Sequence, residues 1–220
     1  MKVGASAAGA AGIERRRIEV EPQRTAVTRA DLRGAIARAH QKLTGRAPSA
    51  AALDVLTAHA SLETGSGAKM YNYNFGGIKG AGPTGETARC RTKEVLDGRE
   101  VEIRDGFRAY RSLDEGALDY VRLMRDRFGG AVARAEAGDV DGFARALKQA
   151  RYYTADESKY ASALRGLAGS ADGAASPAVR PRPEVSPAAA VFPDSFELGR
   201  VLDAIARHPR TIDEIDPDEA

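Results

Sequence analysis

Residues 60–79, ASLETGSGAKMYNYNFGGIK, mark the point where a predicted helix gives way to a loop rich in polar and aromatic residues. Upstream of the loop, Leu53, Leu56, Ala60 and Glu63 recur at helical spacing, so they share one face of that helix. The face is apolar up to Glu63, and its carboxyl group either enters the interior or a cleft, or tips into solvent at the helix end. In the first case the apolar surroundings raise its pKa.

The loop itself favours the first of these interpretations. Residues 64–67 read TGSG, which predicts the end of the helix, and residues 71–80 read YNYNFGGIKG. Glycine permits close approach of the backbone to a ligand, asparagine offers both donors and acceptors, and aromatic faces stack on sugar rings. A carboxylic acid that stays protonated near neutral pH is what a glycosidase needs in order to protonate a leaving oxygen. An ordinary polar loop is the alternative.

Capping residues and hydrophobic periodicity outline the rest of the folded body. Helices are predicted to begin after Thr28, Ser49 and Ser112 and to cover residues 140–149 and 158–167, with Gly129 and Gly130 ending the third. Residues 87–96 and 99–104 are predicted strands, and Asp97-Gly98 between them is typical of a tight hairpin. The sequence therefore predicts an α+β fold, in which a mainly helical lobe and a small β-hairpin lobe flank a substrate groove.

The composition argues against several other classes of protein. The chain has 220 residues, 43% of them hydrophobic and 29% charged, as in globular proteins. Its net charge of +2 does not indicate nucleic-acid binding, and it has no apolar run near the roughly 20 residues of a transmembrane segment. One cysteine excludes an internal disulfide framework and a multi-cysteine zinc site.

Low-complexity stretches predict the domain boundaries. Residues 1–23 are interpreted as a flexible tail, because the Ala/Gly run is too weakly apolar for a secretory signal peptide. Residues 24–167 form the predicted domain, and residues 168–193 a Pro/Ala-rich linker. Residues 194–220 are predicted to form a short amphipathic helix with an acidic tail, and the helix is a candidate docking surface for a protein partner.

Five motifs in a fixed order resemble the flagellar-type peptidoglycan hydrolases, the glucosaminidase group of glycoside hydrolase family 73. The first two are ASLETG at residues 60–65 and NYNFGGIK at residues 72–79. The later three are TKE at residues 92–94, FRAYRS at residues 107–112 and YYTAD with a following tyrosine at residues 152–160. The resemblance covers about residues 28–167.

The resemblance implies a lysozyme-like fold and cleavage of β-1,4 glycosidic bonds in the cell-wall glycan strand by an endo-β-N-acetylglucosaminidase. By motif, Glu63 is the general acid, Glu94 the second carboxylate, and Tyr153 the catalytic tyrosine of the groove near the cleavage site, with Tyr152 as the alternative for that place. Glu100 and Glu102 are rivals of Glu94. The predicted substrate-binding residues are Asn72, Tyr73, Asn74, Phe75, Gly76, Lys79, Tyr110 and Tyr152. No cofactor or metal is implied.

Several alternatives stay open at this stage. Ser66 stands where the family usually has tryptophan, which favours a peptidoglycan-binding or scaffold module of a secretion, tail or flagellar apparatus with weak or lost activity. A muramidase of the same fold would cut the other glycosidic bond. The separation of two carboxylates distinguishes inverting from retaining chemistry, roughly 6.5–9.5 Å against roughly 5–5.5 Å, and the substrate's acetamido group is a third nucleophile. We expect the protein to act on the cell wall, periplasmic or extracellular, after delivery from the cytoplasm without an evident signal peptide.

Two other residues invite chemical interpretations. Cys90 lacks a family motif and is predicted to be a small buried strand residue instead of a nucleophile. His59 and Glu63 are four residues apart on one helix, which places two metal ligands on one face, but no third ligand is evident.

Overall fold

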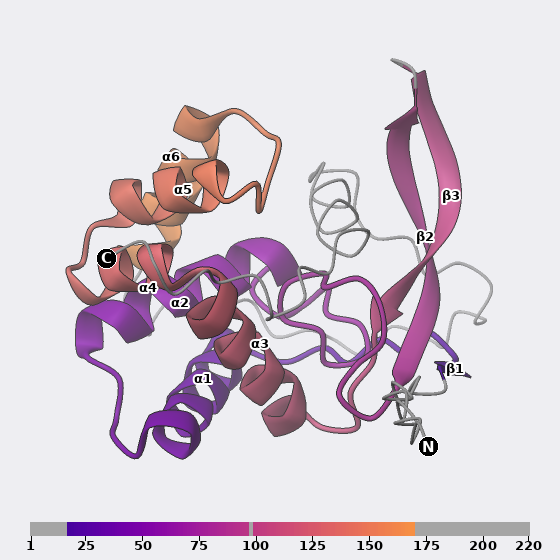
Figure 1. The fold of residues 1–220 in the computed structure, drawn as a ribbon, viewed down its shortest axis with the longest axis horizontal. Coiled ribbons are helices and arrows are strands. Elements are labelled where there is room, and N and C mark those ends of the chain that lie inside the picture. The colour runs from indigo at the N-terminus through magenta and orange to yellow at the C-terminus, as the bar shows by residue number, and fades with distance from the viewer. Residues whose placement is uncertain (1–16, 97–98, 170–220) are drawn as a thin grey trace, which may run out of the picture.

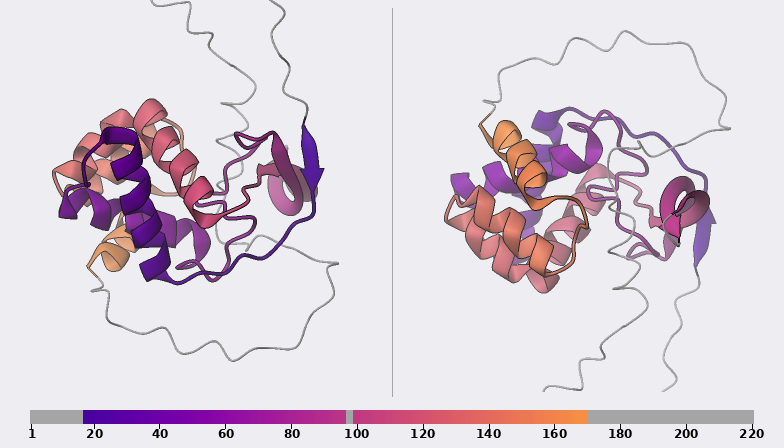
Figure 2. Two further views of the ribbon diagram at one scale, coloured as in Figure 1. Left: turned by 90° about the horizontal axis from the view of Figure 1, so that it is seen from below. Right: turned by 90° about the horizontal axis from the view of Figure 1, so that it is seen from above.

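The computed structural model describes residues 17–96 and 99–169, and within residues 92–102 it describes the backbone alone. The helices gather at one end and a long two-stranded ribbon stands at the other, with the loops of residues 65–85 running between them (Figures 1 and 2). The predicted α+β fold with two lobes is confirmed. Most of the predicted N-terminal tail, nearly all of the linker and the predicted C-terminal helix lie outside the described residues.

The helical lobe is built from helices whose starts follow the capping signals of the sequence. Thr28 accepts a hydrogen bond from the Asp31 amide and its own amide donates to the Asp31 side chain, which forms a complete capping box. Ser49 and Ser112 cap the next two predicted helices in the same way with their side-chain oxygens. The helices are α1 (Arg29–Thr44), α2 (Ala50–Thr64), α3 (Leu113–Arg127), α4 (Gly129–Glu136), α5 (Val140–Gln149) and α6 (Glu157–Ala168).

The third helix, α3, ends just before Gly129 and Gly130, as predicted, but the two glycines also open a further helix, α4, which the sequence analysis did not predict. Phe128 lies between the two helices and is buried. Ala131 and Ala135 of α4 are also buried, and the helix packs against α2 and α5. Packing of this small apolar face outweighs the low helix propensity of the two glycines.

The sheet lobe contains β1 (Ile18–Val20), β2 (Glu86–Leu96) and β3 (Arg99–Arg108) in that spatial order. The predicted hairpin of β2 and β3 is confirmed, and its antiparallel register runs from Thr87 opposite Arg108 to Leu96 opposite Arg99. β1 pairs in parallel with the start of β2 and lies within residues 1–23, which the sequence analysis assigned to a tail. A three-residue strand with two exposed residues has no sequence signal of its own, since its partner is more than sixty residues away.

A buried junction ties the two lobes together near the site. Asp119 of α3 accepts hydrogen bonds at one oxygen from Arg108 at the end of β3, at 2.8 Å, and from the Tyr110 hydroxyl, at 2.7 Å. Gly116 of α3 lies so close to the loop that a Cβ atom there would meet the Tyr73 carbonyl oxygen at 2.0 Å. These contacts hold the loop of residues 71–80 against the helical lobe.

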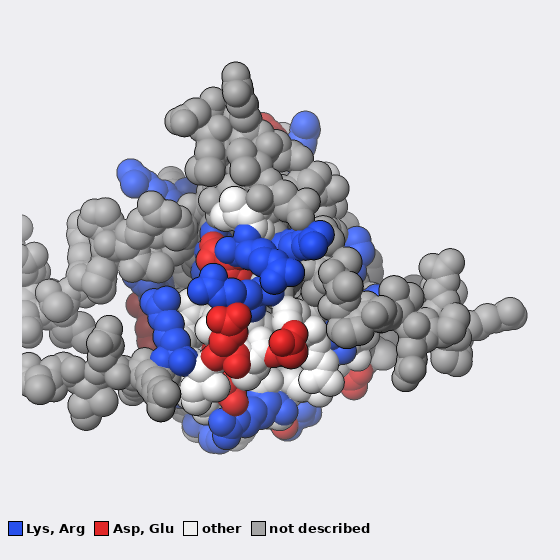
Figure 3. Space-filling model, turned by 90° about the vertical axis from the view of Figure 1, so that its right-hand side faces the viewer, with Lys and Arg blue, Asp and Glu red and all other residues white. Residues whose placement is uncertain are grey.

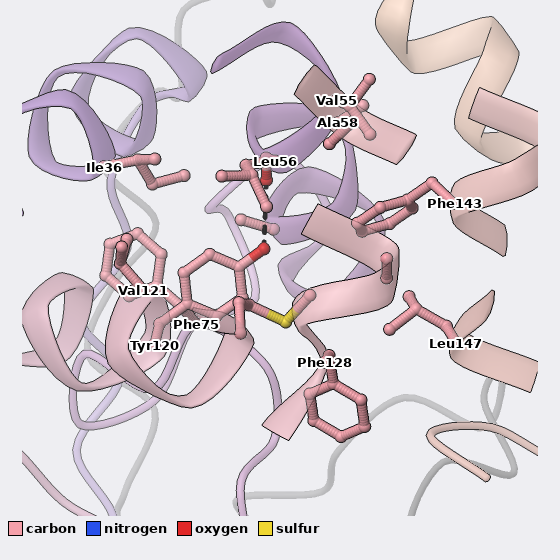
Figure 4. Packing of buried hydrophobic residues seen from close by; sticks show 14 of the residues in the cluster. Ile36, Val55, Leu56, Ala58, Phe75, Tyr120, Val121, Phe128, Phe143 and Leu147 are labelled. Carbon is pink, nitrogen blue, oxygen red and sulfur yellow. Dashed lines mark hydrogen bonds between the residues drawn. The ribbon is translucent and has the colours of Figure 1, made fainter. Parts of the chain in front are cut away.

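The main core lies inside the helical lobe, and α2 passes through its centre. Phe75, Tyr120 and Phe143 fill it around Leu56 and Ile36 (Figure 4). A second, smaller cluster, Ala88, Cys90, Phe107 and Ala109, lies under the sheet. On the face at the sheet end, basic and acidic side chains lie next to one another (Figure 3), and the exposed pair Arg89–Glu19 bridges β2 and β1 at 3.1 Å. In the described part of the chain, no helix has the length and apolar character needed to cross a membrane.

Candidate active site

Glu63 occupies the last turn of α2, and hydrogen bonds and a glycine cap fix the end of this helix. The Thr64 hydroxyl donates to the Ala60 carbonyl at 2.7 Å and accepts from the Gly67 amide at 3.0 Å. Gly65 follows with a φ of +57°, a left-handed conformation that glycine adopts without strain and that closes the helix. The direction of the Glu63 side chain is therefore set by a rigid helix end.

The Glu63 carboxyl group points into the lobe and not into solvent. Its side chain is 3% exposed. Burial disfavours the charged form and raises the pKa of Glu63 to about 8, from an ordinary value of 4.5, against a smaller lowering effect of a hydrogen bond from Tyr160. The group is thus a carboxylic acid that keeps its proton at neutral pH.

Tyr160 of α6 is the tyrosine that contacts Glu63, because its hydroxyl donates to Glu63 Oε1 at 3.0 Å. The predicted groove tyrosine, Tyr153, packs against the Tyr160 ring instead. The two rings stack with centroids 3.8 Å apart, and the Tyr153 hydroxyl donates to the Ala144 carbonyl at 3.0 Å. Tyr153 is buried, and burial raises its pKa to about 12. Tyr160 belongs to the same motif as Tyr153, but its sequence position alone did not indicate contact with the acid.

The asparagines of the loop bind the backbone of the protein itself. The Asn74 side chain donates to the carbonyls of Ile78 and Arg108 and accepts from the amides of Gly76 and Ile78. Asn72 donates to the Glu21 carbonyl and accepts from the Gln23 amide. These side chains shape the loop, and the Asn74 amide uses both of its donors and both of its acceptor positions within the protein.

Other predicted substrate-binding residues are also buried and paired inside the protein. Lys79 forms an ion pair with Asp105 at 2.6 Å, and the Tyr110 hydroxyl donates to Asp119. Phe75 is fully buried and stacks on Tyr120.

Gly76 and Tyr152 support each other below the loop. The Tyr152 hydroxyl contacts the Gly76 carbonyl at 3.5 Å, and a Cβ atom on Gly76 would approach that hydroxyl to 2.9 Å. Of the eight predicted substrate-binding residues, all within the described chain, only Tyr73 keeps a partly exposed side chain. The structure thus assigns most of the motif to holding the loop and not to touching a ligand.

The candidate second carboxylates are placed by their backbone alone. Glu94 lies in β2 opposite Val101 of β3, and Glu100 and Glu102 lie in β3. Their side chains lie outside the described part of the structure.

The structure also bears on the interpretations of Cys90 and of a metal site at His59 and Glu63. Cys90 is buried in β2, and burial raises the pKa of its thiol to about 12, so it has the character of a small core residue, as predicted. Within the described residues, no three His, Cys, Asp or Glu side chains lie where they would hold a metal ion.

Comparison with known proteins identifies the family. The family described as mannosyl-glycoprotein endo-beta-N-acetylglucosaminidase, the Glucosaminidase family, matches residues 39–172, which is more than half of the chain. This range contains Glu63, Tyr160 and the loop described above. No curated protein matches the chain.

Solved structures are also similar to the chain. The catalytic domain of the autolysin Auto from Listeria monocytogenes is 26% identical, with a TM-score of 0.50 over 63% of this chain and 79% of that chain. A peptidoglycan hydrolase mutant from Sphingomonas sp. A1 is 28% identical, with a TM-score of 0.49 over 65% of this chain and 94% of that chain. The chain belongs to the glucosaminidase family and is a glycoside hydrolase of the family 73 type.

Proposed function

We propose that the protein cleaves β-1,4 glycosidic bonds of the peptidoglycan glycan strand as an endo-β-N-acetylglucosaminidase, with Glu63 as general acid. The observation that carries the proposal is the buried Glu63 carboxyl, whose pKa of about 8 keeps it protonated at neutral pH. A proton donor of this kind has no role in a purely structural helix end, where a glutamate would be exposed and ionised.

In the proposed step, the Glu63 proton moves to the glycosidic oxygen as the bond from that oxygen to the anomeric carbon breaks. The leaving sugar departs as a neutral alcohol and Glu63 becomes a carboxylate. The Tyr160 hydroxyl already donates to Oε1, so it stabilises the negative charge that forms there. Tyr160 therefore stabilises the Glu63 carboxylate after the proton has been transferred, and it fixes the orientation of the carboxyl group.

The second half of the reaction requires a group that stabilises or attacks the anomeric carbon. Glu94 is our candidate, as a base for water or as the carboxylate that stabilises positive charge on the sugar. Its position in the β2–β3 hairpin supports this role, because the hairpin stands opposite the helical lobe that carries Glu63 (Figure 1). The acetamido group of the substrate is the alternative nucleophile.

The substrate assignment rests on the family and on the motifs of residues 60–79. The likeness to the catalytic domain of the autolysin Auto is in keeping with it. Such a substrate places the action of the protein at the cell wall. Tyr73, a partly exposed aromatic residue of the loop, is our candidate for stacking on a sugar ring.

The decisive experiment is digestion of purified peptidoglycan, followed by mass spectrometry of the soluble products. We expect fragments with N-acetylglucosamine at the reducing end, and a loss of about 10²–10⁴-fold in rate for Glu63→Gln. The matched control is Glu136→Gln, a glutamate at the exposed end of α4 that we expect to leave the rate unchanged.

Other outcomes would change the proposal in defined ways. N-acetylmuramic acid at the reducing end would keep Glu63 as the acid but make the enzyme a muramidase. Binding to peptidoglycan without release of products would establish the scaffold alternative. The buried, proton-bearing Glu63 favours the enzyme over that alternative, since a scaffold gains nothing from the cost of burying a carboxyl group.

A further inference from the structure

His59 lies one helical turn before Glu63 in α2 and is completely buried. Its ring is enclosed by the rings of Tyr120, Phe143 and Tyr152, with centroids 5.8, 5.4 and 5.0 Å away. Burial lowers the pKa of His59 to about 3, so the imidazole is neutral at every pH at which the enzyme is expected to work. A neutral imidazole carries one proton, on either Nδ1 or Nε2.

The contacts of Tyr120 decide which nitrogen carries that proton. The Tyr120 hydroxyl lies 2.7 Å from His59 Nδ1. It also lies 3.3 Å from the Leu56 carbonyl oxygen, a contact that Figure 4 shows. The carbonyl only accepts, and the hydroxyl has a single proton to give. Both contacts are hydrogen bonds only if Tyr120 donates to Leu56 and His59 donates from Nδ1 to Tyr120.

This tautomer leaves a lone pair on the other ring nitrogen. His59 Nε2 lies 3.6 Å from Glu63 Oε1, beyond hydrogen-bonding distance, and it is buried without a hydrogen-bond partner among the described residues. A lone pair that faces a carboxylate oxygen in an apolar interior repels its negative charge. The same lone pair is compatible with a neutral carboxyl group.

We propose that His59 is a positioning residue for Glu63, held by Tyr120 in the Nδ1–H tautomer so that its Nε2 lone pair opposes ionisation of the Glu63 carboxyl group. The inference rests on the proposed role of Glu63 as general acid, and it explains how the Glu63 carboxyl group keeps its proton. His59 touches neither the substrate nor the reacting bond. It acts through the charge state of its neighbour.

The groups around Glu63 are consistent with this device. Tyr160 of α6 donates to the carboxyl group, and Tyr120 of α3 and Tyr152 after α5 face it as neutral phenols, since burial raises their pKa values well above 10. Two basic groups on helices that pack against α2 are paired with other carboxylates: Arg33 of α1 pairs with Asp54, and Arg134 of α4 lies against Asp139. Tyr160 and His59 thus act on the carboxyl group in opposite senses.

The direct test is the tautomer of His59 in the full-length protein. The chain has three histidines, so a long-range proton–nitrogen NMR spectrum of ¹⁵N-labelled protein is simple to assign, with His59→Gln identifying the signal. We expect the Nδ1–H pattern, unchanged between about pH 5 and about pH 9. An Nε2–H pattern, or a ring that titrates in this range, would overturn the proposal.

A second variant keeps the test valid if His59→Gln does not fold. Tyr120→Phe removes the acceptor of the Nδ1 proton, and we expect the His59 signal to change to the Nε2–H pattern. If the pattern stays Nδ1–H in Tyr120→Phe, Tyr120 does not hold the tautomer and the proposal fails. In the wild type, contacts from the His59 ring protons to Tyr120 and Phe143 provide an independent assignment.

The functional readout is the pH profile of kcat. In His59→Gln, an amide NH₂ replaces the lone pair and donates to the Glu63 carboxylate, so we expect the basic limb to move down by about one pH unit with kcat retained at low pH. Tyr160→Phe removes a donor, and its basic limb should move up. A purely structural role for His59 would reduce stability or kcat at all pH values without moving the limb.

The outcomes separate this inference from the proposed function. If Glu63 is not the general acid, Glu63→Gln stays active, whereas the His59 tautomer is still read directly from the spectrum. If Glu63→Gln is inactive and the two pH profiles do not move in opposite directions, the proposed function stands and the role of His59 is refuted.

Discussion

Two glutamates, one in each lobe, show how the same side chain acquires opposite character. Glu63 in the helical lobe is buried at the end of α2, and burial raises its pKa to about 8. Glu86 at the start of β2 accepts hydrogen bonds from Arg111 and Thr84, and these, the Arg111 bond first, lower its pKa. The local environment, and not the residue type, decides which of them holds a proton.

The difference extends to the lobes themselves. The helical lobe surrounds α2 with apolar side chains, so a polar group there is either paired or neutral. The sheet lobe has a small apolar cluster and carries exposed ion pairs such as Arg89–Glu19. A proton donor is therefore built in the helical lobe, and charged groups are tolerated in the sheet lobe.

The pH dependence of stability provides the largest expected contrast between the two glutamates. Because the folded-state pKa of Glu63 is above its ordinary 4.5, its stabilising contribution is complete below pH 4.5 and is lost as the pH rises to about 8. The full loss is about 5 kcal/mol at most, or about 1.4 kcal/mol per pH unit. Denaturant unfolding of wild type and Glu63→Gln at several pH values in this window should show a smaller decline in the variant.

Glu86 serves as the control with the opposite sign. Its pKa is lowered, so its contribution is present above pH 4.5 and is lost as the pH falls through its folded-state value. Glu86→Gln should leave the decline between pH 4.5 and 8 intact. Equal slopes for wild type and Glu63→Gln would contradict the buried acid.

The junction between the lobes should be the next most sensitive feature. Asp119→Ala leaves Arg108 half-buried without its carboxylate partner, and we expect a loss of about 3–5 kcal/mol in the free energy of unfolding. The control on the same helix is Asp126→Ala, whose exposed pair with Arg125 should contribute less than about 1 kcal/mol. Similar losses for both variants would show that the two lobes do not depend on this contact.

The close approach of the loop to α3 predicts a smaller effect. Gly116→Ala places a methyl group against the Tyr73 carbonyl, and we expect it to destabilise the protein by about 1–3 kcal/mol through displacement of the loop. Gly130→Ala in α4 meets no atom within 4 Å and should be neutral or stabilising by about 0.5–1 kcal/mol. Thermal unfolding of both variants measures the difference, and a stable Gly116→Ala would show that the loop is not held this closely.

The exposed pairs of the sheet lobe should matter least. Glu19→Ala removes the partner of Arg89, and we expect a change below about 1 kcal/mol that vanishes at high salt. Urea unfolding at low and at high ionic strength tests this. A larger, salt-independent loss would mean that the pairing of β1 with β2 contributes more than its exposed side chains indicate.

Short-range patterns predicted the elements that short-range forces determine. Thr28, Ser49 and Ser112 cap helices through contacts with residues three positions away, and the pairing of β2 with β3 follows from two strand patterns separated by the Asp97-Gly98 sequence signal. The inward direction of Glu63 follows from the helical spacing of its apolar neighbours. The sequence patterns did not predict β1, because its partner strand is distant in the sequence, or α4, because packing against α2 and α5 outweighs the two glycines at its start.

The sequence by itself determined the α+β fold, the helix that carries the acid and the family motifs. Only the tertiary structure decided that Tyr160 and not Tyr153 contacts Glu63, that Asn72 and Asn74 bind their own backbone, and that His59 meets Tyr120. An asparagine in a loop or a tyrosine in a helix has the same donors and acceptors whatever it faces. Its role depends on which groups lie within about 3 Å of it once distant segments have packed together. A local sequence pattern does not specify those distances.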